Sequence, residues 1–161
     1  MDHLIDIEIE DARWLEALPD AAAIVETGVT AALNAGDLPE QADVVVLLCD
    51  DAEMRALNRD YRSKDKATNV LSFPAPKSMR APGMTHLGDI ALGYETCARE
   101  AAEQGKSLKN HILHLSVHGA LHLLGYDHVR DDEAEEMEAL ERAILKGLNV
   151  PDPYAEDQDA R

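Results

Sequence analysis

Three histidines near the end of the sequence have the residue type and spacing of a metal site. His118 and His122 are four residues apart in an apolar segment that predicts a helix, so both rings lie on one helix face about 6 Å apart along the axis. Two imidazoles in that arrangement can bind one ion at about 2.0–2.1 Å. Gly125 allows a sharp reversal after the helix, which returns His128 toward the same face. The pattern H-x3-H-x5-H therefore predicts a site for one transition-metal ion.

Two further histidines lie on the same predicted helix, at positions 111 and 114. His114 shares the stripe of His118 and His122, but it is eight residues from His122. That separation is about 12 Å of helix rise, which is too far for both rings to bind one ion. We therefore expect His114 to pack or to support a ligand. For any single histidine here the alternative is a buried ring satisfied by ordinary hydrogen bonds.

Three neutral histidines without a fourth protein ligand leave one coordination position open. Structural zinc sites are usually closed by four ligands, and neither Cys49 nor Cys97 is near in sequence. A water in an open position can have a pKa near about 7, which indicates hydrolysis. Position 119 holds glycine where the zinc-protease motif H-E-x-x-H has its general base, which argues against a peptidase. Imidazole also binds copper, nickel and iron, so Zn²⁺ is the default and other divalent transition metals are alternatives.

The basic residues are concentrated in one window of an otherwise acidic chain. The formal net charge is −17, yet residues 55–80 carry +5, because seven basic residues there face only Asp60 and Asp65. The seven are Arg55, Arg59, Arg62, Lys64, Lys66, Lys77 and Arg80. Such a patch can attract phosphate while the remainder, at −22, repels it. The alternative is a solvated helix end and loop, with Arg62 paired to Asp60 or Asp65.

The elements that must position these residues follow from hydrophobic periodicity and from capping residues. Strands are predicted at 3–10, 42–49, 70–73 and 86–93, and helices at 12–18, 20–34, 51–61, 94–104, 107–124 and 131–147. This order predicts one α+β domain over residues 1–150, with about four strands and five or six helices. We expect an exposed, mobile loop at 74–86 and a disordered tail at 151–161.

The last predicted helix and the two cysteines are assigned to the core. Met137, Leu140, Ile144 and Leu148 have the spacing of a buried stripe on the helix at 131–147. The cysteines have no paired spacing and are expected to be buried thiols in a reducing compartment. The sequence lacks a signal-like N-terminus and a long apolar stretch, so we expect a soluble cytoplasmic protein without a membrane partner. No feature specifies an oligomeric state.

Three segments together resemble the YbeY family of bacterial rRNA-maturation endoribonucleases. They are LNRDYRSKDKATNVLSFP (57–74), LGDIALG (87–93) and HGALHLLGYDH (118–128). The resemblance implies a single-strand-specific, metal-dependent endoribonuclease that acts in rRNA processing, including maturation of the small-subunit RNA 3′ end, and in ribosome quality control. Its implied partners are single-stranded rRNA and the ribosome or its small subunit.

The resemblance also carries over to individual residues and to the fold. It implies one zinc ion per chain, held by His118, His122 and His128, and an important arginine at Arg62. It implies a mixed sheet of about four strands with one antiparallel edge strand. Arg62 could bind a scissile phosphate through two guanidinium N–H groups and stabilise the negative charge of the transition state. Lys64 and Lys66 are expected to steer RNA.

Several residues keep two interpretations at this stage. Asp127 could orient a ligand histidine or form a turn, and Asp89 could reach the site or only end a strand. Tyr126 could stack on a base or pack in the core. Two other functions also compete: a ribosome-associated assembly factor in which the metal is mainly structural, and a metallohydrolase acting on small phosphoesters.

Overall fold

The computed structural model describes residues 3–36, 38, 40–76 and 84–154. Within these ranges the chain forms four strands and six helices, as the sequence predicts for an α+β domain. The elements are β1 (Leu4–Ile9), α1 (Arg13–Ala17), α2 (Ala21–Ala35), β2 (Gln41–Cys49), α3 (Asp51–Arg62), β3 (Val70–Pro74), β4 (Met84–Gly93), α4 (Tyr94–Glu103), α5 (Leu108–Leu123) and α6 (Asp131–Gly147).

The four strands form one mixed sheet in the order β1-β2-β4-β3. β1, β2 and β4 run parallel, and β3 pairs antiparallel with β4 at one edge. This confirms the mixed sheet with one antiparallel edge strand. The central strand β2 is apolar over most of its length, but its burial alternates, with Val44, Val46 and Leu48 fully buried on one face. That face carries most of the core, because successive strand residues point to opposite sides.

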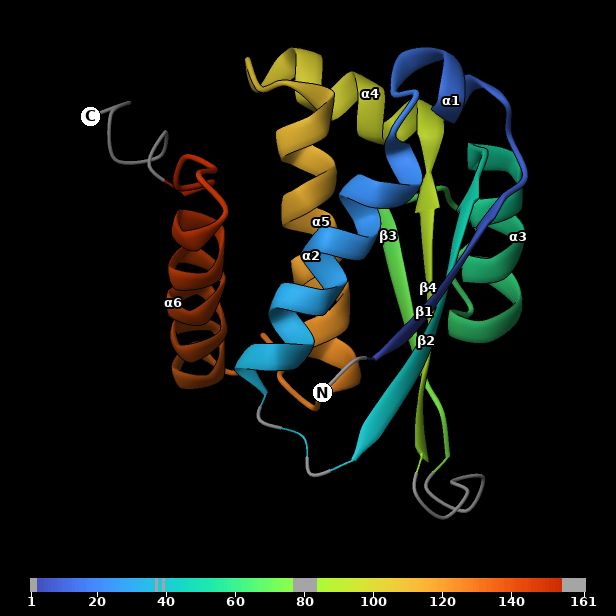
Figure 1. Cartoon of the computed structure of the whole chain (residues 1–161). Coiled ribbons are helices and arrows are strands. Elements are labelled where there is room, and N and C mark those ends of the chain that lie inside the picture. Colours follow the sequence, from blue (N-terminus) through green and yellow to red (C-terminus); the bar gives the residue numbers. More distant parts are fainter. Residues whose placement is uncertain (1–2, 37, 39, 77–83, 155–161) are drawn as a thin grey trace.

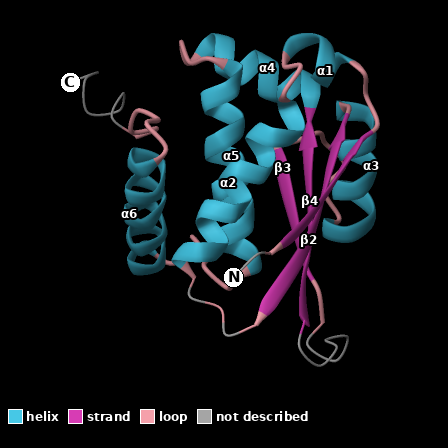
Figure 2. Ribbon diagram, viewed as in Figure 1, coloured by secondary structure: helices cyan, strands magenta, loops and turns pink. Residues whose placement is uncertain are grey.

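The helices divide into layers around this sheet (Figure 1). α2 and α5 pack together on the core face, α3 lies against the opposite face, and α6 lies outside the α2–α5 layer (Figures 1 and 2). α5 therefore has the sheet on one side and α6 on the other. This position explains why α5 is apolar nearly all round: ten of its sixteen residues are buried.

α5 approaches the edge of the sheet closely because position 119 has no side chain. A Cβ atom at Gly119 would lie 3.1 Å from Ile90 Cγ2 and 3.2 Å from Ser72 Oγ. The Ser72 hydroxyl donates a hydrogen bond of 3.1 Å to the Gly119 carbonyl, which joins β3 to α5. Position 119 thus faces the sheet, and a glutamate there would have no space.

The two ends of α5 follow their sequence signals. Ser107 caps the start, where its Oγ accepts a hydrogen bond of 3.1 Å from the Asn110 amide. Gly125 follows the last turn with a φ of +105°, in the left-handed region that favours glycine. The predicted reversal after the helix is therefore present.

β4 differs from its prediction at its first residues. It begins at Met84, two residues before the predicted start, so the predicted loop at 74–86 is too long at its end. A register shift against β2 falls between His86 and Gly88. Gly88 has a φ of +143°, and a Cβ atom there would meet the Phe73 carbonyl. Loop residues 77–83, with Lys77 and Arg80 of the basic window, lie outside the described residues.

The stripe predicted on α6 is displaced by one position. Its fully buried residues are Met137, Glu141 and Leu145, at intervals of four, whereas Leu140, Ile144 and Leu148 are half-buried at its margin. The buried stripe therefore includes a carboxylate at its centre. Of the tail predicted to be disordered, residues 151–154 are described and contact the domain, while 155–161 lie outside the described residues.

Both cysteines are free and buried, as predicted. Burial raises the pKa of Cys49 to about 12 and also raises that of Cys97, so both thiols stay protonated at neutral pH. Among the helices in the described part of the chain, none is both long enough and apolar enough to cross a bilayer.

The conformation of Gly125 can be tested with a matched pair of substitutions. Gly125 and Gly147 are both exposed, and a Cβ atom would have open space at either position, but only Gly125 has a positive φ. Gly125→Ala should therefore reduce the free energy of unfolding of the metal-free protein by roughly 1–2 kcal/mol. Gly147→Ala should leave it unchanged or raise it by up to ~1 kcal/mol. Urea denaturation measures both, and equal effects would contradict the assigned turn.

Candidate metal centre

The three predicted histidines converge at the end of α5. His118 and His122 come from the helix, and His128 comes from the segment after the turn. The Nε2 atoms of His118 and His122 are 3.1 Å apart, and one nitrogen from each of the three rings lies within 4.8 Å of the others. Two nitrogens bound to one ion at about 2.0–2.1 Å and a tetrahedral angle are roughly 3.3 Å apart. The arrangement is therefore compatible with a metal ion.

The turn that delivers His128 is fixed by backbone hydrogen bonds. The Gly125 amide donates to the His122 carbonyl at 3.0 Å, and the Tyr126 amide donates to the Leu121 carbonyl at 3.1 Å. Asp127 then accepts a hydrogen bond of 2.7 Å from the His128 amide. Its carboxylate lies 3.9 Å from His128 Nδ1, beyond hydrogen-bond distance. Of the two interpretations of Asp127, the structure supports the turn.

A different carboxylate orients the first histidine. Nδ1 of His118 lies 2.5 Å from Oε1 of Glu141, which is fully buried on α6. An ionised carboxylate only accepts hydrogen bonds, so Nδ1 donates to it, and in the neutral ring this leaves the lone pair of Nε2 on the side of His122. A ligand histidine commonly has this second contact, which sets its tautomer. Glu141 is a residue that the sequence analysis missed.

Glu141 accepts two further hydrogen bonds, both at Oε2. One comes from Nε2 of His114 at 3.3 Å, and the other comes from the hydroxyl of Tyr154. Burial raises the pKa of Glu141, but the hydrogen bonds from His114, His118 and Tyr154 outweigh it and lower the pKa to about 2. The carboxylate is therefore ionised at neutral pH. His114 supports Glu141 here, in agreement with the prediction that it is not a ligand of the three-histidine site.

His114, His118 and Glu141 also form a cluster of possible metal ligands. Two ligand atoms of one ion at a tetrahedral angle would be roughly 3.3 Å apart. The distance of 2.5 Å between His118 Nδ1 and Glu141 Oε1 is too short for an ion between them and fits a hydrogen bond. We therefore assign this second cluster to support of the first.

The electrostatics around His122 favour its unprotonated form. Burial is the largest cause that lowers the pKa of His122, and the neighbouring His118 and His128 lower it further. A lower pKa keeps the ring neutral at pH 7, which is the form that binds a metal. His111 is held separately, with Nε2 at 3.0 Å from Glu100, and it takes no part in the cluster.

The three histidines line the same cleft as part of the basic window. The cleft has a volume of about 690 Å³. Its lining includes two groups of residues. His118, His122 and His128 come from α5 and the segment after it, and Arg62, Lys64 and Lys66 come from the end of α3 and the following loop. The loop is anchored by the buried Asn58, whose amide donates a hydrogen bond of 2.9 Å to the Lys66 carbonyl.

Arg62 is exposed, and neither aspartate that was considered as its partner is available. Asp60 pairs with Arg59 at 3.1 Å, and Asp65 pairs with Arg55 at 2.7 Å. Across residues 3–36, 38, 40–76 and 84–154, no carboxylate lies within ion-pair distance of Arg62. Its guanidinium is therefore available to an anion in the cleft.

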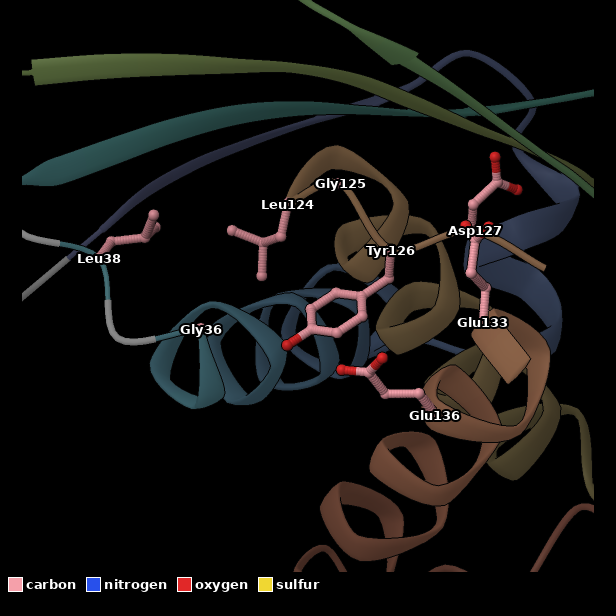
Figure 3. A pocket seen from close by; sticks show the side chains of 8 residues that line it. All are labelled: Gly36, Leu38, Leu124, Gly125, Tyr126, Asp127, Glu133 and Glu136. Atoms are coloured by element: carbon pink, nitrogen blue, oxygen red, sulfur yellow. The ribbon is translucent and has the colours of Figure 1, made fainter. Parts of the chain in front are cut away.

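Asp89 lies outside the cleft, and Tyr126 lines both the cleft and a second pocket. Asp89 lines a different cavity, of about 630 Å³, between α3 and the sheet, so it does not reach the three-histidine site. Tyr126 lines the cleft and also a pocket of about 370 Å³ beyond the turn, into which Tyr126 and Glu136 point (Figure 3). That smaller pocket includes three carboxylates and would repel phosphate. The cleft with the histidines is therefore the candidate site.

Comparison with known proteins gives consistent matches along the chain. A sequence profile of the family described as Endoribonuclease YbeY matches residues 7–149. The protein of that name from Chelativorans sp. (strain BNC1) is 62% identical over 152 residues, which cover 94% of this chain and 93% of that protein. The one from Azorhizobium caulinodans is 52% identical over 153 residues, which cover 94% and 96%.

A solved structure supports the fold. The solution structure of TM1509 from Thermotoga maritima aligns with a TM-score of 0.54, over 91% of this chain and 92% of that one. The two sequences are 22% identical in the alignment. At that identity the likeness concerns the arrangement of helices and strands alone.

The state of Glu141 predicts how stability depends on pH. Its pKa is about 2 in the folded protein, against an ordinary value of 4.5 for a glutamate in the unfolded chain, so the unfolded chain takes up the proton first as the pH falls. Stability from this group is therefore complete above about pH 5 and is lost progressively toward pH 2. In Glu141→Gln, the slope of the unfolding free energy between pH 4.5 and 3 should be smaller by up to about 1.4 kcal/mol per pH unit.

The control is Glu135→Gln, which removes the same charge from an exposed position of α6. Urea denaturation of the metal-free proteins measures the slopes. If both variants gave the wild-type slope, the ionised and hydrogen-bonded state of Glu141 would be wrong.

Proposed function

This chain belongs to the Endoribonuclease YbeY family, and we propose from that premise that it is a zinc-dependent endoribonuclease that cleaves single-stranded ribosomal RNA. One observation carries the proposal beyond family membership. Three histidines that each offer one ligand nitrogen, and three cationic side chains of the basic window, line a single cleft. A phosphodiester backbone is an anion that such a cleft can hold beside a metal site.

The donor set fits one zinc ion per chain, although other divalent transition metals could also bind it. His118, His122 and His128 would hold the ion, and the described residues offer no cysteine or carboxylate that closes this set. An ion bound there would supply Lewis-acid activation of a water or a phosphoryl oxygen. Two features of the chain favour metal binding: burial lowers the pKa of His122, and Glu141 accepts a hydrogen bond from Nδ1 of His118, which directs Nε2 toward the other histidines.

Arg62 has the chemistry to bind the scissile phosphate. A guanidinium presents two parallel N–H donors to phosphate oxygens, and it is permanently charged. Because Asp60 and Asp65 are paired with other arginines, binding a phosphate does not require Arg62 to break an ion pair with either of them. The extra negative charge that develops on the phosphate during hydrolysis would strengthen this contact, which is how a positioned cation increases the rate.

Lys64 and Lys66 complete the electrostatic selection of substrate. Both line the cleft, whereas the sequence outside residues 55–80 carries a net charge of −22. Long-range repulsion by the body would disfavour RNA elsewhere on the surface, and the local patch would attract it to the histidines. The match to Endoribonuclease YbeY supports an RNA substrate. From the sequence resemblance we further propose that this RNA is ribosomal, including the 3′ end of the small-subunit RNA, and that the setting is the ribosome or its small subunit in the cytoplasm.

The catalytic role of the metal can be tested by removing one ligand. His118→Ala should lose both the bound zinc and the cleavage of precursor rRNA, because two histidines and no third donor hold the ion weakly. His86→Gln changes a histidine outside the cleft and should retain both. Metal analysis and a cleavage assay on the same preparations measure the outcome. Normal cleavage by metal-free His118→Ala would show that the metal is not catalytic.

The role of Arg62 can be tested against a neighbouring arginine. Arg62→Ala should reduce the cleavage rate by about 10²- to 10³-fold, as loss of a transition-state contact does, while the zinc content is unchanged. Arg59→Ala removes an exposed arginine of the same helix that is paired with Asp60 and does not line the cleft, so its rate should stay within about 2-fold of wild type. Equal rates in the two variants would remove Arg62 from the mechanism.

A further inference from the structure

We propose that Glu141 and Tyr154 are positioning residues that hold His118 in its metal-binding tautomer, so that the C-terminal segment Pro151–Tyr154 is part of the metal centre. The inference rests on the metal-binding role proposed above for His118. It adds to that role a carboxylate from α6 and a tyrosine from the segment after it. Neither belongs to the sequence motifs that indicate the site.

The first observation is the burial of Glu141. The chain has 32 acidic residues, yet Glu141 is the one carboxylate that is buried within the described part of the chain, with no exposed surface. Moving a carboxylate out of water is costly unless several donors replace the water. Three donors are present: one from His114, one from His118 and one from Tyr154. The cost of burying the carboxylate is offset only when all three donors are in place, so these side chains must adopt one specific arrangement.

The second observation is which nitrogen Glu141 contacts. The carboxylate lies at Nδ1 of His118, while Nε2 of the same ring lies 3.1 Å from His122 Nε2 in the three-histidine cluster. A proton held on Nδ1 leaves the lone pair of Nε2 free for an ion. Without Glu141 the ring could carry its proton on Nε2 or rotate, and either change would compete with metal binding.

The third observation is how Tyr154 is placed. Its hydroxyl donates to Oε2 of Glu141, and its ring packs edge-on against His114 at a centroid distance of 5.7 Å. The guanidinium of Arg142 lies 5.0 Å from the centre of the ring. Arg142 also contacts Asp152 at 3.3 Å, which holds the segment against α6. Tyr154 is therefore held by contacts of its ring and of the neighbouring Asp152 as well as by its hydroxyl.

These contacts join the C-terminal segment to the ligand through two hydrogen bonds. Tyr154 fixes Oε2 of Glu141, and the same carboxylate fixes Nδ1 of His118 through Oε1. Loss of the tyrosine hydroxyl would leave His114 as the one donor at Oε2 among the described residues. The carboxylate would then be free to rotate, and the orientation of His118 would be less strictly determined. Zinc affinity should therefore depend on a residue on the far side of Glu141 from the cleft.

The test measures zinc affinity by competition with a chromophoric chelator in the full-length chain. Glu141→Gln should raise the Kd for zinc by about 10- to 100-fold, as changes of such hydrogen-bond partners do. Tyr154→Phe removes one hydroxyl and should raise the Kd by about 3- to 10-fold. Glu135→Gln and Tyr94→Phe are the matched controls, because Glu135 is exposed on α6 and Tyr94 packs on Trp14. Both controls should keep the Kd within about 2-fold of wild type.

A second readout does not depend on zinc. In the metal-free protein, ¹⁵N NMR of the histidine side chains should show His118 protonated on Nδ1, and Glu141→Gln should shift the proton toward Nε2. Unchanged Kd values in both variants would overturn the proposal, even if their melting temperatures fell, because a purely structural role lowers stability alone. A wild-type chain that binds no zinc but shows the Nδ1 tautomer would instead refute the proposed metal site and retain the positioning contact.

Discussion

The burial of α5 between the sheet and α6 is the constraint on which the rest of the structure depends. A helix in that position must be apolar nearly all round, yet α5 carries four histidines, and each ring nitrogen that leaves water needs a partner. Nε2 of His111 finds one in Glu100, and His114 and His118 share Glu141, whereas Nδ1 of His111 and Nδ1 of His114 have no hydrogen-bond partner among the described residues. His122 and the outer nitrogen of His118 face the cleft. The same burial that builds the core therefore sorts the histidines into supported rings and free nitrogens.

Glycine makes this arrangement possible at two places on α5. At position 119 the absence of a side chain lets the helix lie close to Ile90 of β4 and to Ser72 of β3, the edge strand that borders the cleft. At position 125 a positive φ turns the chain back and brings His128 to the other two rings. The backbone thus brings the three rings together, and the contact with Glu141 orients the ring of His118.

The basic residues of α3 and of the loop after it supply the positive charge that the histidine cluster lacks. Their charges are divided between two roles, because Arg55 and Arg59 neutralise nearby aspartates while Arg62 lines the cleft without an acidic partner among the described residues. The strongly acidic remainder of the chain then makes this cleft a local exception for a polyanion. Specific substrate binding would follow from the contrast between the two regions, and not from the net charge.

The sequence predicts the parts of this site that depend on local geometry. Helix spacing and the glycine turn are sufficient to select His118, His122 and His128, and helix rise separates His114 from them. The mixed sheet with one antiparallel edge strand was implied only by the family resemblance, since parallel pairing is not encoded in one strand, and the order of the strands was not predicted. Glu141 was missed because a glutamate on an acidic helix indicates a solvated face. Its interval of four from Met137 was the available signal. That Arg62 has no acidic partner among the described residues follows from the ion pairs of Asp60 with Arg59 and of Asp65 with Arg55, which depend on the three-dimensional arrangement of these side chains.

X-ray absorption spectroscopy of the zinc-loaded protein tests the central claim most directly, because it measures the atoms bound to the ion. The account predicts one ion per chain with three imidazole nitrogens at about 2.0–2.1 Å and the remaining position filled by oxygen from solvent. A sulfur ligand, or a fourth protein ligand that closes the site, would contradict it. In that case the ion would be structural, and the open position that hydrolysis requires would not exist.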